Sequence, residues 1–353
     1  MIARTLALLV GLIVATSAGA QTPPAPLVLE AKIPLGSIKG RIDHLAIDLK
    51  RKWLLVAELG NDSLGVVNVV AGKVLRTITG LSEPQGVGYE PITDAVYVAN
   101  ASDGSVRILR GEDLAAVGRI DLSDDADNVR IDADRNRVLV GYGAGALAII
   151  DPTTRTKVGD IRLKAHPESF QIEGDRVFVN VPDARLIEVA DLTEGEVVGA
   201  WPTQPNHSNF PMAMDGEARR LFVVFRSPAR LVVMSAADGG VVGSLDACGD
   251  ADDVFVDAKR HRVYVTCGAG VVDCSSIAAG ATSGSVRYPP CRARGPRCSF
   301  RSWIGCSLRF ARPAMSLRRS GSSGPVDCVP RSDTFWGHSR HPIRRSSKLC
   351  ATR

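Results

Sequence analysis

Helical periodicity, long apolar runs and familiar catalytic motifs are all missing from the body of this 353-residue chain. After the N-terminal stretch there is no further run of about 18 apolar residues, which excludes an internal transmembrane helix. No segment repeats its apolar residues at the helical period, which excludes a helical domain. Serine-nucleophile motifs, phosphate-binding glycine loops and zinc-finger spacings are absent too. The sequence therefore says more about architecture than about chemistry.

Basic charge is also scarce, although the net charge of the chain is +5. Residues 1–273 carry 28 Lys and Arg against 36 Asp and Glu, whereas residues 274–353 carry 15 against 2. The body is thus mildly acidic, and nothing in it resembles a basic nucleic-acid face. We expect neither a nucleic-acid partner nor a membrane anchor.

The first twenty residues have the three regions of a secretory signal peptide. Arg4 gives a positive start, Leu6 to Ala15 an apolar core, and Ala18-Gly19-Ala20 a small-residue cleavage site. Cleavage after Ala20 predicts a periplasmic or secreted protein; the alternative is a buried N-terminal helix. Residues 21–40 then form a leader that contains prolines. Apolar and polar residues alternate in it from Leu27 to Ile33, which predicts a strand.

A repeat of about 42 residues organises the chain from residue 41 to residue 273. Each unit has a strand that ends in an acid, a tight polar turn, a second apolar strand and two further strands. Ile150-Asp151-Pro152-Thr153 is an example of the turn between the third and fourth strands. The second strands are centred, at intervals of 42, 42, 39, 44 and 42, on Leu55, Tyr97, Leu139, Phe178, Phe222 and Tyr264. Four antiparallel strands per unit predict an all-β fold, a β-propeller, because one such sheet cannot bury both faces alone.

Val96-Tyr97-Val98-Ala99-Asn100, with its echoes at 177–180 and 263–266, resembles the YVTN-type (YncE-like) propeller repeat of secreted bacterial proteins. The resemblance covers about residues 27–273. It implies a propeller that usually has seven blades, with an N-terminal strand, here Leu27 to Ile33, completing the last one. It implies no single reaction, so no catalytic residue is carried over. The Gly-His and Trp-Asp signatures of WD40 blades and the tryptophan-docking repeats of quinoprotein dehydrogenases are missing.

The repeat stops in the sixth unit, after Val271-Val272-Asp273. Residues 274–353 hold 14 Arg, 15 Ser and six of the eight cysteines, and one more period from Tyr264 lands on Cys306, where no apolar strand is found. The tail could be a basic binding segment, a disulfide module or the product of a shifted reading frame. We favour the frameshift, because the break falls inside a blade. The sequence thus predicts five full blades, an incomplete sixth, a disordered tail and impaired function.

Equivalent positions two places before each inner strand recur at intervals of 41 or 42, and four of the six residues there are acidic. Inner strands line the channel of a propeller, so these residues should form a ring at one mouth. The ring comprises Asp43, Gln85, Asp127, Glu168, Phe210 and Asp252, and is followed directly by His44, Asn128, Ser169 and Asp253. Asp43, Asp127, Glu168 and Asp252 could bind Ca²⁺ or another hard cation, and the ring could equally bind a cationic small molecule. Alternatively, these acids only fix each loop.

Two further groups of residues carry weaker signals. His166 and His207 occupy equivalent loops and, with His44, could bind a transition metal, or they could be ordinary polar loop residues. Cys248 and Cys267 flank the first hairpin of the sixth unit, which brings them together and predicts a disulfide in an oxidising compartment.

These features lead to two functional hypotheses. The first is a periplasmic binding or scaffold protein that recognises a small molecule or a periplasmic protein at the channel mouth. The rival is a metal-assisted lactonase or hydrolase, which rests on analogy between propellers. Neither hypothesis assigns a catalytic residue, and no cofactor is certain, with Ca²⁺ a possible one.

Overall fold

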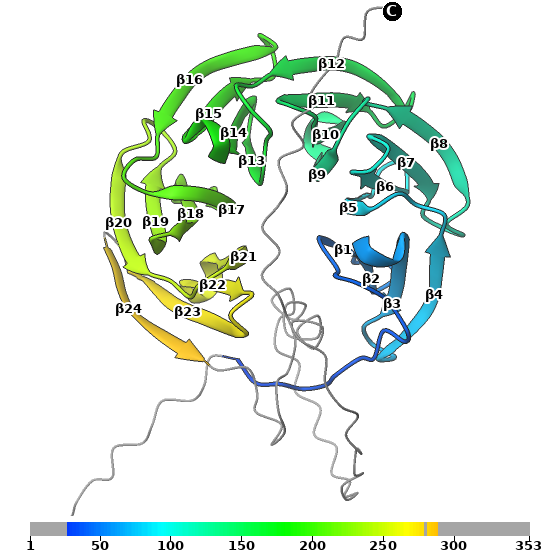
Figure 1. Ribbon diagram of the computed structural model, residues 1–353, viewed down its shortest axis with the longest axis horizontal. Helices are drawn as coiled ribbons and strands as arrows, with labels where there is room; N and C mark the ends of the chain where they lie inside the picture. The colour runs from blue at the N-terminus through cyan, green and yellow to red at the C-terminus, as the bar shows by residue number, and fades with distance from the viewer. Residues whose placement is uncertain (1–26, 279–280, 289–353) are drawn as a thin grey trace, which may run out of the picture. The chain divides into compact units, whose positions relative to one another are not determined.

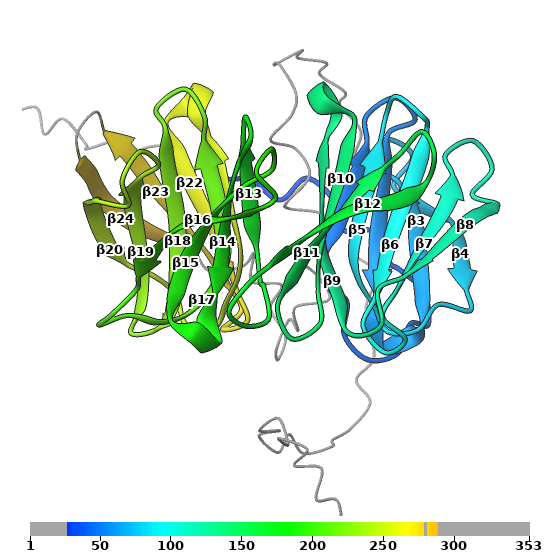
Figure 2. The same ribbon diagram turned by 90° about the horizontal axis from the view of Figure 1, so that it is seen from above.

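The computed structural model describes residues 27–278 and 281–288, whose strands form six four-stranded antiparallel sheets arranged as propeller blades (Figure 1). In each sheet the strand order follows the chain, with the first strand innermost and the fourth at the rim. Figure 2 shows the same blades from the side. This arrangement confirms the predicted all-β propeller.

The first three blades take up the chain to residue 162. Blade one contains β1 (Leu45–Asp48), β2 (Trp53–Glu58), β3 (Ser63–Asn68) and β4 (Lys73–Thr79). Blade two contains β5 (Pro84–Glu90), β6 (Ala95–Asn100), β7 (Ser105–Arg110) and β8 (Ala116–Asp121). Blade three contains β9 (Ala126–Asp132), β10 (Arg137–Tyr142), β11 (Ala146–Asp151) and β12 (Thr156–Arg162).

The other three blades follow in the same order. Blade four contains β13 (Phe170–Glu173), β14 (Arg176–Val181), β15 (Leu186–Asp191) and β16 (Glu196–Pro202). Blade five contains β17 (His207–Asp215), β18 (Arg220–Ser227), β19 (Ala229–Ser235) and β20 (Val241–Asp246). Blade six contains β21 (Ala251–Asp257), β22 (Arg262–Cys267), β23 (Val271–Ala278) and β24 (Ala281–Tyr288).

Short 3₁₀ turns provide all the helical structure of the described residues. They are η1 (Leu59–Asn61), η2 (Ala133–Arg135), η3 (Pro182–Ala184) and η4 (Ala258–Arg260). No helix in this part of the chain is long and apolar enough to cross a membrane.

The acid that ends most inner strands fixes the turn to the second strand. Asp48 Oδ1 accepts hydrogen bonds from the backbone amides of Lys50 (2.8 Å) and Arg51 (3.0 Å). Glu90, Asp215 and Asp257 cap their own turns in the same way. A carboxylate that accepts turn amides replaces the hydrogen bonds that these groups lose in a tight connection. The acids at this end of the blades are therefore structural.

The hydrophobic core lies between blades, in five clusters. Leu55 and Leu64 of blade one pack with Val98 of blade two, and the same arrangement recurs at each junction as far as blades five and six, where Phe222 meets Val265. Blades two to five thus each bury one face against the preceding blade and the other face against the next. This mutual burial is the reason that the sheets are stable only as an array.

Between blades six and one, the N-terminal segment takes the place of direct blade packing. Leu27 packs with Tyr264 and Val272 of blade six, and Ile33 and Leu35 pack in the cluster of blade one. In Figure 1 this segment runs from the end of blade six to blade one. The predicted strand at residues 27–33 is absent, because the position beside β23 that a closing strand would take is filled by β24.

The sixth blade is complete, which corrects the predicted break after Asp273. Strand β23 continues to Ala278, and β24 pairs with it antiparallel from Ala281 to Tyr288. The sequence signal failed here because rim strands need few apolar residues: the rim strand β4, for example, is mostly exposed. The frameshifted, disordered tail is predicted for residues 274–353, but residues 274–278 and 281–288 lie in β23 and β24. The rest of that tail and the predicted signal peptide lie outside the described residues.

Candidate functional site

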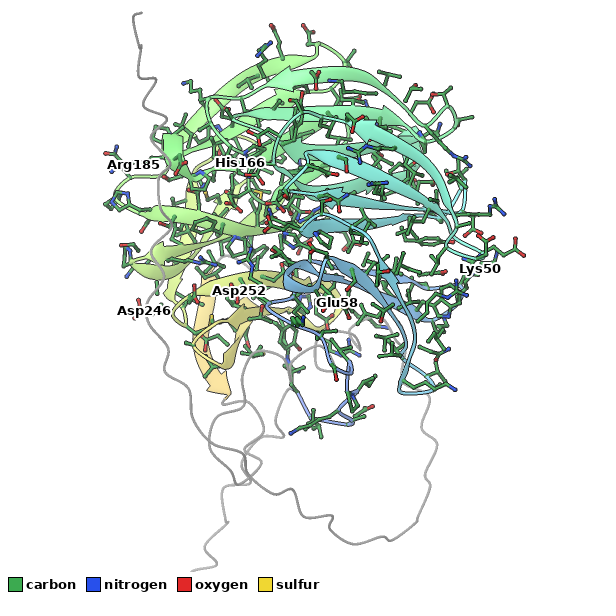
Figure 3. The ribbon with its side chains drawn as sticks, turned by 45° about the vertical axis from the view of Figure 1, so that its right-hand side comes forward. Lys50, Glu58, His166, Arg185, Asp246 and Asp252 are labelled. Atoms are coloured by element: carbon green, nitrogen blue, oxygen red, sulfur yellow. A yellow bond between two sulfur atoms is a disulfide. The ribbon has the colours of Figure 1, made fainter. Side chains whose placement is uncertain are left out.

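The predicted ring lies where the inner strands begin, at one mouth of the channel. Gln85 belongs to β5, Asp127 and Asn128 to β9, and Asp252 and Asp253 to β21. Asp43 and His44 immediately precede β1, Glu168 precedes β13, and Phe210 lies in β17. In Figure 3, His166 and Asp252 lie near the middle of the molecule, whereas Lys50 and Asp246 lie at its edge.

Irregular strand pairing presents the ring residues at this mouth. The ladder of four inner strands shifts register at the ring position: around Gln85, around Asp127, around Phe210 and around Asp252. Such bulges leave residues unpaired and change the direction of their side chains. A close backbone approach holds the arrangement, because a Cβ atom at Gly86 would overlap the carbonyl oxygen of Asp127.

Asp127 is the centre of the site. Its side chain is buried, and its two carboxylate oxygens face imidazoles from two other blades. Oδ1 lies 3.6 Å from Nε2 of His44, and Oδ2 lies 3.9 Å from Nε2 of His166. Both distances exceed a hydrogen bond, and Oδ1 has no hydrogen-bond partner among the described residues. A buried carboxylate oxygen without a donor is energetically costly, so the site is poised to accept one.

The two imidazoles and Asp127 stabilise one another's charges. Burial opposes ionisation of Asp127, but His166 and His44 outweigh it and hold the pKa of this carboxyl below its usual range. Burial likewise disfavours the imidazolium of His166. However, Asp127 and a 2.6 Å hydrogen bond from Nδ1 to the carbonyl oxygen of Gly143 raise its pKa to about 9. At neutral pH the site therefore contains an ionised Asp127 beside a protonated His166.

The other carboxyl groups of the mouth hold their protons unusually strongly. Burial, reinforced by the charge of Asp127, raises the pKa of Glu168 to about 8. Burial raises the pKa of Asp252 to about 6, although Arg226 opposes the shift. The pKa values of Asp43 and Asp253 are raised as well, chiefly by burial. Ionisation of these four carboxyl groups is thus disfavoured, chiefly because burial removes them from water.

Blades two and five complete the rim. Gln85 Nε2 donates to Asp125 Oδ1 at 3.3 Å. Arg226 of β18 donates to the carbonyl oxygen of Ala251 (2.9 Å) and to Asp252 Oδ1 (3.0 Å), with its guanidinium 4.3 Å from the ring centroid of Phe210. The alignment on inner strands missed Arg226, because it lies on a second strand.

Asn128 and Ser169, which the sequence placed next to the ring, have different surroundings. Asn128 is only 1% exposed, and neither side-chain polar atom has a hydrogen-bond partner among the described residues. Ser169 Oγ accepts a hydrogen bond from Arg130 at 3.1 Å. Arg130 is a second residue that the sequence analysis missed. A signal was present, because Arg130 is the only charged residue at its position of the inner strands. The equivalent residues of the six blades are Ala46, Gly88, Arg130, Gln171, Ala213 and Phe255.

The donor set fits a metal poorly. Within residues 27–278 and 281–288, no three His, Cys, Asp or Glu side chains converge in a way that would hold a metal ion. His207, the third predicted histidine, begins β17, and no hydrogen bond or ion pair of the described residues joins it to Asp127. Calcium binding by Asp43, Asp127, Glu168 and Asp252 therefore stays a prediction that this geometry does not favour.

A disulfide links Cys248 to Cys267, as the sequence analysis expected. It joins the connection before β21 to the end of β22, next to the mouth. In the same region, Gly268 donates its backbone amide to the carbonyl oxygen of Asp250 at 2.6 Å. Together these links hold the connection that leads into β21, the strand that carries Asp252.

No family model and no curated protein matches the chain. Among solved structures, the chain is similar to one described as Kuenenia stuttgartiensis Hydrazine Synthase, with 17% identity and a TM-score of 0.59, over 66% of this chain and 76% of that one. It is also similar to a chain of a structure described as a Mitotic Checkpoint Complex, with 14% identity and a TM-score of 0.62, over 82% of this chain and 90% of that one. Both likenesses concern the propeller fold.

Proposed function

We propose that this protein is a binding protein whose channel mouth recognises a small cationic organic molecule. The observation that carries the proposal is Asp127, a buried carboxylate whose Oδ1 has no hydrogen-bond donor in the part of the chain that the structure describes. An ammonium group can donate to this oxygen and at the same time offset the surrounding negative charge. The propeller fold is consistent with such a binding role.

The raised pKa values around Asp127 support a cationic ligand over an anionic one. Burial raises the pKa of Glu168, Asp43 and Asp253, and the charge of Asp127 adds to the shift at Glu168 and Asp43, so each group loses free energy when it ionises. A bound cation reverses that effect, because it stabilises the ionised form of every carboxylate near it. Binding should therefore release protons and tighten as the pH rises from 6 to 8.

Binding is favoured over the rival metal-assisted lactonase or hydrolase. That reaction needs a metal with an open coordination position, and the described residues offer no converging set of three ligands. A cationic ligand needs only carboxylates and an acceptor such as Asp127 Oδ1, which has no donor among the described residues. A periplasmic protein could supply the same chemistry through a lysine side chain, but the proposal concerns a small molecule.

Export and family membership belong to the same proposal. We infer that the protein acts in the periplasm, from the charged start, apolar core and small-residue cleavage site of residues 1–20. We also infer that it is a member of the YVTN-type repeat family, from the recurring Val-Tyr-Val strands. The propeller fold and the disulfide are consistent with these inferences, whereas the six blades of the described residues are one fewer than the seven usual in that family.

Calorimetric titration with hexylamine at pH 7 tests the binding proposal. Asp127→Asn keeps the shape of the side chain and removes its charge, so we expect at least tenfold weaker binding. Asp160→Asn, which removes an exposed carboxylate from β12 of the same blade, should change the affinity by less than twofold. The proposal fails if the unmodified protein does not bind hexylamine, or if Asp127→Asn binds as well as the unmodified protein.

A further inference from the structure

Three exposed aliphatic side chains lie on neighbouring turns at the end of the blades opposite the channel mouth. Leu49 belongs to the turn between β1 and β2, Val70 to the turn between β3 and β4, and Ile92 to the turn between β5 and β6. They are 53%, 65% and 64% exposed. Because the inner strands begin at the mouth and the strands of a blade are antiparallel, first and third strands end away from the mouth.

Direct contacts join these three turns. Arg51, in the first turn, pairs with Asp94, in the turn of blade two, through Nη2 and Oδ2 at 2.6 Å. The backbone amide of Val69 donates to the carbonyl oxygen of Lys52 at 3.1 Å, which links the two turns of blade one. A side-chain cap closes each turn as well. The three aliphatic side chains are therefore presented by one connected surface.

The fold does not require aliphatic residues at these tips, because the other blades lack them. In blades three to six, the two positions after the inner strand hold a small residue and then a charged one: Ala133-Asp134, Gly174-Asp175, Gly216-Glu217 and Ala258-Lys259. At the position of Val70, blades two to five have Glu112, Thr153, Thr193 and Ala237. Blades one and two thus expose apolar surface that costs free energy in water and that the turns do not need.

Lysines surround these side chains, although residues 1–273 carry more acids than bases. Lys50 and Lys52 lie in the first turn, Lys73 follows the second, and all three are exposed. Figure 3 shows Lys50 at the edge of the molecule. None of the three has an ion-pair partner among the described residues. The acids of these turns are taken up by caps and by the ion pair between blades; they are Asp48, Glu90 and Asp94.

We propose that this surface, the turn patch of Leu49, Lys50, Lys52, Val70, Lys73 and Ile92, binds reversibly to a bilayer with anionic headgroups. The aliphatic side chains insert at the level of the headgroups, and the lysines bind lipid phosphates. Peripheral binding of this kind depends on the apolar area buried and on attraction to anionic lipids, and it needs no membrane-crossing helix. The channel mouth, at the other end of the blades, stays open to its ligand.

A bilayer fits the turn patch better than a protein does. Side chains on separate tips can enter a fluid surface one by one, whereas a folded partner must offer a matching hollow for each of them. A second copy of this chain would set lysines against lysines in a symmetric contact. The positive charge and the separate apolar tips therefore favour an anionic lipid surface.

Hydrogen-exchange mass spectrometry of the full chain with vesicles tests the inference. Residues 274–353 carry 15 Lys and Arg, so binding alone does not locate the contact, whereas exchange reports each turn separately. Vesicles with equal parts of phosphatidylglycerol and phosphatidylcholine should slow exchange in residues 49–52, 69–73 and 91–94. Vesicles of phosphatidylcholine alone should not. The equivalent turns of blades three and five, residues 133–136 and 216–219, should remain unchanged.

Paired substitutions measure the apolar contribution. Leu49→Ser combined with Ile92→Ser should raise at least tenfold the lipid concentration that half-protects residues 69–73, because two inserted aliphatic side chains are lost. Val158→Ser combined with Val198→Ser is the matched control. These side chains are 61% and 54% exposed on the rim strands β12 and β16, and their loss should shift the same concentration by less than twofold.

Lysine substitutions measure the contribution of charge. Lys50→Gln and Lys73→Gln should each raise the half-protecting lipid concentration of residues 91–94 about fivefold, and added salt should weaken binding further. Lys164→Gln is the control, because Lys164 is exposed in the connection between β12 and β13, at the mouth end of the blades. It should change this concentration by less than twofold.

The following outcomes would overturn the inference. The turn patch does not bind anionic lipid if its three turns exchange at the same rate with and without these vesicles, or if phosphatidylcholine alone protects them equally. An unchanged lipid dependence in the double serine variant would show that the aliphatic side chains do not insert. Protection by higher protein concentration without lipid would identify a second copy as the occupant, and protection by poly-glutamate but not by vesicles would identify an acidic protein.

Discussion

Replacing Glu168 by Gln should stabilise the protein at alkaline pH and leave its stability unchanged at acid pH. The pKa of this carboxyl is about 8 in the folded protein, against an ordinary value of 4.5. Below pH 4.5 the group is protonated in both the folded and the unfolded state and contributes no difference. Between pH 4.5 and 8 only the unfolded state ionises freely, so the free energy of unfolding falls as the pH rises.

The size of the effect follows from the pKa difference. Each pKa unit corresponds to about 1.4 kcal/mol, so a difference of about 3.5 units gives an upper limit of about 5 kcal/mol above pH 8. Water that enters the mouth when the group ionises will reduce this penalty, and we expect a gain of about 2–5 kcal/mol for Glu168→Gln at pH 9. Glutamine has the shape of the protonated glutamic acid, so it should fit without repacking.

Urea denaturation at pH 5, 7 and 9, followed by circular dichroism, measures this difference. Glu194→Gln is the control, because Glu194 is exposed in the turn between β15 and β16 and its neutralisation should change stability little at any of these pH values. The reasoning is refuted if Glu168→Gln is no more stable than the unmodified protein at pH 9. It is equally refuted if the gain has the same size at pH 5, because the effect must come from ionisation.

Three shorter predictions concern the rest of the site. Gly86→Ala should destabilise the fold by about 3 kcal/mol or more and weaken hexylamine binding, because the new Cβ displaces the backbone of Asp127. Thermal denaturation measures the loss of stability, and calorimetry measures the loss of affinity. Replacing Cys248 and Cys267 by Ser should lower the free energy of unfolding by about 3 kcal/mol, as expected for a closed loop with a sequence separation of 19, whereas an unchanged urea midpoint would contradict this. His166→Gln should cost more stability at pH 6 than at pH 10: the folded pKa of about 9 lies above the unfolded value of 6.5, so the stabilisation is complete below pH 6.5 and is lost as the pH rises through 9.

The sequence by itself determined the repeat, the four-stranded blade and the position of the inner strands. These are local properties: alternating apolar residues specify a strand, and an acid such as Asp48 specifies the turn that follows it. The regular interval between copies then predicted that Asp127 and its equivalents would share one mouth of the channel. The sixth blade was cut short in this prediction because a rim strand lacks that local signal.

Only the tertiary structure decided how the mouth works. Asp127 meets His44 from blade one and His166 from blade four, and no spacing along the chain encodes a contact between three blades. The strand bulges direct the ring residues, and Arg226 and Arg130 arrive from positions outside the aligned set. The raised and lowered pKa values are consequences of this burial and proximity. The chemistry of the site therefore comes from packing between repeats, whereas the scaffold comes from the repeat itself.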